Sequence, residues 1–283
     1  MSYEFEPNRL YRMPTHFGPS LGPRQGPDGR KFQWKDNPKV TRYSVSFLSD
    51  REQLARLLPP GFEPVGEPVV TVTFSYMTEL EWLAGRGYNT LGVSWPAAFK
   101  GETDSATGSF LAVLWENMAD PIITGREDLG FSKIYCELPP AKVAKGTTRC
   151  TASWYGFRFL ELEVHDLHEP AKAKPAKKPA SDAPAPPPND GLLHYKYMPK
   201  TGHWGQADVA YAVLTPAASP DTVVKQVLAG EGSVRFSRAS WEQMPTQFTV
   251  VNALAELPVR QPRGARVVKT VGAKDLSDQR ILQ

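Results

Sequence analysis

Stretches in which apolar and polar residues alternate recur along the chain, and they restrict the fold to one built mainly from β-strands. A period of two puts successive side chains on opposite faces of a strand. Such strands are expected at residues 40–47, 69–76, 109–115, 151–164, 192–198 and 207–214, around 234–236, and from about 267 onward. No GxGxxG, P-loop, HExxH or GxSxG motif occurs, and strands do not alternate with helices. We therefore predict a mainly β (α+β) fold whose sheet is largely antiparallel and closed, with a few peripheral helices.

Three short helices are expected beside this sheet. In residues 49–58, Ser49 followed by Glu52 predicts a capping box, and Pro59 and Pro60 end the segment. A second helix is expected at residues 220–229, before a glycine. A third is expected at residues 246–256, where apolar residues recur every three or four positions.

Two segments of the 283-residue chain do not fit a regular element. Gly and Pro dominate residues 13–30, which predicts an irregular N-terminal arm over 1–39. Residues 169–190 are rich in Pro, Ala and Lys, a composition that cannot bury apolar surface and predicts a mobile or disordered insert. Strand patterns resume on both sides of it, so we predict one domain spanning residues 1–283.

Charge, hydropathy and cysteine usage exclude several classes of protein. The net charge of +3 is not arranged as a basic stripe interleaved with aromatic residues, so no nucleic-acid partner is expected. No apolar run reaches about 18 residues and no secretory signal opens the chain, so no membrane partner is expected either. Cys136 and Cys150 form no CxxC pair, which favours a cytoplasmic protein. His194 and His203 lack metal-ligand spacing, and no metal site is predicted.

One lysine stands out by its surroundings. Lys133 lies between Phe131–Ser132 and Ile134–Tyr135, after an apolar strand and a turn that begins Asp120-Pro. Apolar neighbours on both sides make it a candidate for burial. Most lysines are solvated surface charges, so this local pattern alone does not indicate catalysis.

The segment GREDLGFSK at residues 125–133 resembles the lysine motif of the acetoacetate decarboxylase family. In that motif Gly-Arg-Glu, a short spacer, an aromatic residue and Pro precede a Schiff-base lysine, and the spacing from Arg126 to Lys133 fits without a gap. Further blocks resemble the family in the same order, among them MPTHFGP, EPVVTVTF, the GYNTLGV turn and GSVRFSRASWEQMPTQF. The resemblance implies a cone-like antiparallel β-barrel with an internal pocket, a homo-oligomer, and no cofactor beyond the Schiff base on Lys133.

A Schiff-base mechanism places a demand on the lysine. Its amine must be neutral to attack a ketone, and lowering a pKa from about 10.4 to about 7 costs roughly 4 to 5 kcal/mol. Desolvation or a neighbouring cation can supply this. The iminium that forms can then accept electrons from a carboxylate that leaves as carbon dioxide, or convert pyruvate into an enamine that attacks an aldehyde.

This chain departs from the family pattern around the lysine. Ile134 replaces a second lysine, and Thr90 and Thr73 stand where the family has glutamates. The carboxylate-binding arginine has no clean match, and Lys39 or Arg42 is the candidate substitute. These losses disfavour decarboxylation of acetoacetate but leave the lysine chemistry intact.

Several other residues are candidates for the pocket, together with Thr90. Tyr88 and Trp115 are candidate pocket walls or, equally, core residues. Arg126 and Glu127 are candidates for orienting the substrate or the loop that carries Lys133 (the lysine loop), or for a structural ion pair. Glu116 is a candidate general acid or base, against the alternative of a solvated side chain at a strand end.

Three functions follow from these residues. The first is an aldolase-dehydratase that condenses pyruvate with an aldehyde through a Schiff base on Lys133. The second uses the same lysine to decarboxylate acetoacetate or a larger β-keto acid. The third is a non-catalytic barrel that binds a small ligand. The predicted partners are thus a small keto acid and, for the first function, an aldehyde.

Overall fold

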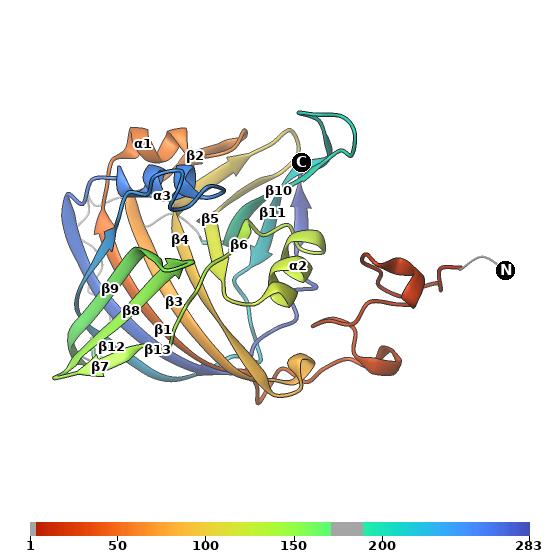
Figure 1. Ribbon diagram of the computed structural model, residues 1–283, viewed down its shortest axis with the longest axis horizontal. Coiled ribbons are helices and arrows are strands. Elements are labelled where there is room, and N and C mark those ends of the chain that lie inside the picture. Colours follow the sequence, from red (N-terminus) through yellow and green to blue (C-terminus); the bar gives the residue numbers. More distant parts are fainter. Residues whose placement is uncertain (1–3, 171–188) are drawn as a thin grey trace.

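The computed structural model describes residues 4–170 and 189–283, and within them one large sheet dominates the fold (Figure 1). Its strands are β1 (Lys39–Leu48), β2 (Phe62–Pro64), β3 (Val69–Leu80), β4 (Arg86–Lys100), β5 (Ser105–Glu116), β6 (Lys133–Tyr135), β7 (Lys142–Ala144), β8 (Thr147–Trp154), β9 (Phe157–His168), β10 (Gly191–Pro199), β11 (Ala207–Pro216), β12 (Val223–Phe236), β13 (Gln261–Val271) and β14 (Arg280–Leu282).

The sheet is largely antiparallel, as predicted, but its strand pairings form an open path. The order is β14-β11-β10-β5-β4-β3-β1-β13-β12-β9-β8-β7, with β2 beside β4 and β6 beside β5. Among the strands that the structure describes, the pairings of β5 with β10 and with β6 are the parallel ones. Within the described residues no pairing joins β14 to β7, so the closed barrel is not confirmed. Both end strands have only three residues, too few for a long ladder.

One face of the curved sheet carries the hydrophobic core. Its largest fully buried apolar side chains are Trp95, Trp115, Phe74, Phe159, Leu54, Leu91, Leu160, Leu162, Leu193 and Met244. The helix α3 (Phe248–Ala255) adds Val251 and Leu254 to this core and confirms the helix expected at residues 246–256. Burial of these side chains supplies the main driving force for folding.

The other two α-helices differ in part from those expected from the sequence. The helix α1 (Arg51–Arg56) is present, but its N-cap is Asp50, whose side chain accepts a hydrogen bond from the Gln53 amide at 3.0 Å. Ser49 is the preceding buried residue. The helix α2 (Ala119–Glu127) was not predicted. Its Pro121 lies in the first turn, where backbone N–H groups have no intrahelical acceptor, so the proline does not disrupt it.

The structure has a strand where one helix was expected, and two strands where one was expected. The helix expected at residues 220–229 is wrong, because residues 223–229 belong to β12, which pairs with β13 and β9. Its β-branched Val223, Val224 and Val227 suit a strand. Residues 151–164 cover two strands, since β8 and β9 form a hairpin that turns at Tyr155 and Gly156, both with positive φ. The GYNTLGV segment begins β4.

The N-terminal arm lies outside the sheet beside α2 (Figure 1). Two 3-10 turns, Thr15–Phe17 and Pro27–Gly29, are its helical elements in the described residues. Arg12 and Arg24 both bond Asp128, just after α2, at 3.0 and 2.5 Å. Most of the predicted mobile insert, residues 171–188, lies outside the described residues. No helix in the described part of the chain is long and apolar enough to cross a membrane.

Candidate active site

Lys133 is the first residue of β6, and its side chain is buried against the end of β5. The chain leaves α2, turns at Gly130 with a φ of 75°, and returns parallel to β5 with Lys133 opposite Leu114. The Lys133 Nζ lies 2.9 Å from Oε1 of Glu116 and donates to the Pro121 carbonyl at 2.9 Å. Only 9% of the side chain is exposed. The burial suggested by its apolar neighbours is therefore present.

The surroundings of Lys133 favour the neutral amine. Burial lowers the pKa of Lys133, the nearby Glu116 opposes this in part, and the charge of Arg24 lowers it further. Ile134 supplies no cation, as the sequence indicated, but the N-terminal arm brings one from far away in the chain. No sequence signal marked Arg24, which lies in an irregular Gly/Pro segment.

Glu116, the last residue of β5, is buried with Lys133. Its side chain is 1% exposed, so it is not the solvated strand-end residue that was the alternative. Burial raises the pKa of Glu116, while the attraction of Lys133 offsets part of this rise. Its Oε2 is buried and has no hydrogen-bond partner among the described residues. Both pKa shifts favour a carboxylic acid beside an amine over a carboxylate beside an ammonium.

Gly125 lets the helix α2 lie directly against the lysine. A Cβ atom at this position would lie 2.4 Å from Cε of Lys133 and 2.5 Å from its Nζ. Real Cβ atoms do not approach other atoms so closely, so any larger residue would displace the amine. The sequence motif contained this glycine but gave no indication of its contact.

A cavity of about 380 Å³ opens at the lysine. Apolar and aromatic side chains form much of its wall, and cationic side chains form another part. The apolar and aromatic ones include Trp34, Met77, Leu80, Trp82, Tyr88 and Leu129, and the cationic ones are Arg24, Arg42 and Lys274; the Lys133 amine and Asp275 also line the cavity. Tyr88, a predicted pocket residue, thus lines it, and burial together with the charge of Glu116 raises its pKa. The cavity suits a small anion attached to an apolar body.

The structure distinguishes the two candidate substitutes for the missing arginine. Lys39 is 56% exposed and pairs with Glu79 at 2.7 Å, away from the cavity. Arg42 lines the cavity and donates to the Thr270 hydroxyl at 3.1 Å. Burial lowers the pKa of Arg42, and no carboxylate pairs with it in residues 4–170 or 189–283. Arg42 is therefore the one of the two available to a bound anion.

Thr90 is buried where three strands meet. On β4 it lies opposite Ser75 of β3 and opposite Glu116 of β5. Thr73, the other threonine at a family glutamate position, bonds Ser44 at 2.9 Å. A carboxyl group is thus absent at Thr90 but present directly across the ladder, on Glu116. Sequence comparison by position could not reveal this, because the two residues belong to different strands.

The structure places the remaining predicted site residues elsewhere. Trp115 faces the core, where its Nε1 donates to Oε1 of Gln247 at 2.8 Å, because it alternates with Glu116 along β5. Arg126 donates to the Lys133 carbonyl at 2.8 Å and so holds the lysine loop. The side chain of Glu127 does not line the cavity. The carbonyl of Glu127 accepts from Lys196 at 2.6 Å.

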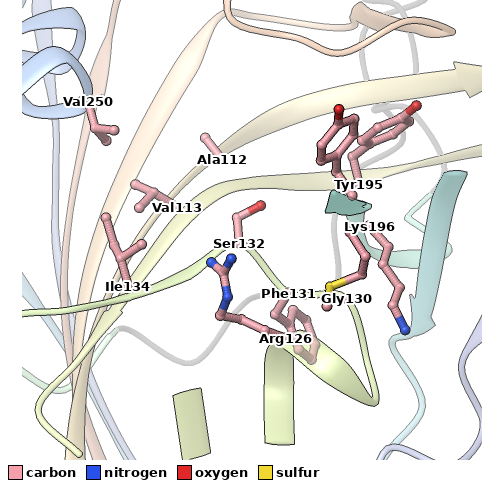
Figure 2. A pocket seen from close by; sticks show the side chains of 12 residues that line it. Ala112, Val113, Arg126, Gly130, Phe131, Ser132, Ile134, Tyr195, Lys196 and Val250 are labelled. Atoms are coloured by element: carbon pink, nitrogen blue, oxygen red, sulfur yellow. The ribbon is translucent and has the colours of Figure 1, made fainter. Parts of the chain in front are cut away.

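Arg126 also lines a second cavity, of about 330 Å³, behind the lysine loop (Figure 2). Figure 2 shows the Arg126 guanidinium near Ser132 and the Lys196 amine pointing away from both of them. The Lys133 side chain is not part of this wall. Of the predicted site residues, Tyr88 therefore lines the lysine cavity, Glu116 contacts the amine and Arg126 holds the lysine backbone, whereas Trp115 belongs to the core.

His194 packs against the segment that leads into Lys133. His194 is fully buried, stacks on Phe131 with ring centres 4.2 Å apart, and lies 3.1 Å from the Gly130 carbonyl. Burial lowers its pKa to about 4, so it is neutral at pH 7. In the described residues one group has metal-ligand spacing, His165, Asp166 and Glu231, and it lies outside the lysine cavity.

Comparisons with known proteins agree with this architecture. The family model described as acetoacetate decarboxylase matches residues 12–269. Acetoacetate decarboxylase from Legionella pneumophila has a TM-score of 0.61 at 17% identity, over 91% of this chain and 92% of that one. The enduracididine biosynthesis enzyme MppR, complexed with the condensation product of pyruvate and imidazole 4-carboxaldehyde, has a TM-score of 0.58 at 18% identity, over 93% and 97%. No curated protein sequence matches significantly.

Proposed function

The chain belongs to the acetoacetate decarboxylase family, and on this premise we propose that it is a Schiff-base lyase that condenses pyruvate with an aldehyde and dehydrates the product. The observation that carries the proposal is the buried amine of Lys133. It lines a cavity whose walls are partly cationic and partly apolar. The threonines at the two family glutamate positions favour condensation over decarboxylation.

The reaction begins with attack of the neutral Lys133 amine on the keto carbon of pyruvate. The carbinolamine loses water to give an iminium, and loss of a methyl proton gives an enamine. The enamine carbon adds to the aldehyde, a second water leaves, and hydrolysis of the iminium releases an unsaturated 2-keto acid and the free lysine. The net change is pyruvate plus aldehyde to product plus one water.

We assign each reactant to a part of the cavity. The pyruvate carboxylate is proposed to bind Arg42, because Arg24 already pairs with Asp128. The body of the aldehyde would contact the apolar wall formed by residues such as Trp34, Trp82 and Leu129. MppR, which has a similar fold, was solved with pyruvate and with a condensation product of pyruvate and an aldehyde. This likeness supports the proposed pair of substrates.

Decarboxylation of acetoacetate or a larger β-keto acid is the second candidate, favoured by the family match itself. It uses the same iminium, which accepts the electron pair as carbon dioxide leaves. Release of carbon dioxide from acetoacetate at an enzymatic rate would distinguish it from condensation. The third candidate is a ligand-binding protein without catalysis, and a measured Lys133 pKa near that of free lysine would favour it over covalent catalysis.

Reductive trapping tests the covalent step directly. With pyruvate and cyanoborohydride we expect the intact mass to rise by one reduced pyruvyl adduct, located on the peptide that contains Lys133. Screening of aldehydes should then give an unsaturated 2-keto acid with its own ultraviolet absorbance. The absence of an adduct with both pyruvate and acetoacetate would contradict the proposal.

The proposed carboxylate contact predicts a defect in substrate binding. Arg42→Met should lower kcat/KM for pyruvate by about 10- to 100-fold, because a charge-assisted hydrogen bond is lost. Most of the change should appear in KM if the contact is equal in substrate and transition state. Lys39→Met, at the exposed pair with Glu79, is the matched control and should retain the wild-type KM. A wild-type KM in Arg42→Met would remove this residue from the binding site.

A further inference from the structure

Glu116 and Lys133 form a buried pair, and its geometry indicates more than a structural contact. Oε1 of Glu116 lies 2.9 Å from the lysine Nζ, while Oε2 is buried and has no hydrogen-bond partner in the described residues. A buried carboxylate would leave that oxygen unsatisfied at considerable cost. An acidic proton held between the two side chains reduces the charge that is buried.

The other charged and titratable groups near this pair are poorly suited to exchange a proton with the lysine. Arg24 is bonded to Asp128, and His194 faces the Gly130 carbonyl and Thr215. Tyr88 lines the cavity, but burial and the charge of Glu116 raise its pKa, so it is a poor acid. Among the described acidic side chains, Glu116 is the one whose carboxyl oxygen lies within hydrogen-bond distance of the Lys133 amine.

Resting on the proposed function, we propose that Glu116 is the catalytic acid and base of the lysine, with one proton shared between the two side chains. In the resting pair Glu116 is the acid and Lys133 the amine. When Nζ bonds to the keto carbon, the positive nitrogen transfers a proton to the carbonyl oxygen and forms the neutral carbinolamine. The Glu116 carboxyl then protonates the hydroxyl, water leaves, and the nitrogen electron pair forms the iminium.

This assignment explains how the chain tolerates the loss of the family glutamates. The carboxylate sits on β5 opposite Thr90, across one ladder of hydrogen bonds. After water leaves, the Glu116 carboxylate is the counter-ion of the iminium, so the buried site remains electrically neutral. The carboxylate is also placed to take a proton back when the iminium is hydrolysed.

The test compares two reactions of the same amine. Trapping of pyruvate needs a proton donor for the departing hydroxyl, whereas acylation by p-nitrophenyl acetate does not, because p-nitrophenolate leaves as an anion. In Glu116→Gln the trapping rate should fall by about 100-fold or more, the usual size of an acid–base contribution. Acylation of Lys133 should be at least as fast as in the wild type at pH 7, since an uncharged glutamine cannot stabilise the protonated, unreactive form of the lysine.

Each outcome decides the assignment. If trapping is slower in Glu116→Gln while acylation keeps its wild-type rate or exceeds it, Glu116 is supported as the acid. Loss of both reactions would assign it the structural role of holding the amine, and an unchanged trapping rate would exclude it from the chemistry; both overturn the proposal. No adduct in the wild type would instead overturn the proposed function, and the dehydration role with it. Glu231→Gln, an exposed substitution on β12, is the control, and its trapping rate should match the wild type.

Discussion

Replacing Lys133 by methionine should abolish the pyruvate adduct and reduce condensation by about 10⁴-fold or more, the scale on which an enzyme loses activity with its nucleophile. Methionine keeps much of the side-chain volume but has no amine. Lys133→Arg should be equally inactive, because a guanidinium stays protonated and cannot attack a ketone. Product formation and adduct mass measure both effects.

A second lysine in the cavity provides the control. Lys274 lines the same wall, but its amine is held by Asp278 at 2.7 Å and by the Pro216 carbonyl. Lys274→Met should therefore keep the adduct on Lys133. Wild-type turnover in Lys133→Met would refute the covalent mechanism, and an adduct that disappears only in Lys274→Met would assign the nucleophile to that residue.

Gly125→Ala should lower the rate of adduct formation by about 100-fold, the size of effect expected when a reacting group is displaced by about 1 Å. The added methyl group would lie 2.4 Å from Cε of Lys133, so the lysine side chain must move. Stability should change far less. Alanine favours a helix over glycine by about 1 kcal/mol, which offsets part of the strain.

Comparing activity with the midpoint of thermal unfolding separates these effects. Ile123→Ala, an exposed substitution on the same helix, should leave the adduct rate unchanged. If Gly125→Ala reacted at the wild-type rate, the close contact between α2 and the lysine would not position the amine. If it only unfolded, the strain would fall on the backbone instead of on the side chain.

Local patterns predicted most of the sheet. The strands at residues 40–47, 69–76 and 192–198 correspond to β1, β3 and β10, because alternation of apolar and polar residues reflects one buried face. The predicted helix at 220–229 failed because β12 is stabilised by pairing on both edges, a contribution that no local window contains. The short end strands likewise could not be read from local alternation.

The sequence by itself determined the strand-rich fold and singled out Lys133, since alternation and the nine-residue motif at 125–133 are local properties of the chain. Only the tertiary structure decided what surrounds the amine. Strand pairing places Glu116 beside it, the arm brings Arg24 towards it, and α2 presses Gly125 against it. The pKa of a lysine depends on the solvent and charges removed or supplied by such distant segments, and these act through space, not along the chain.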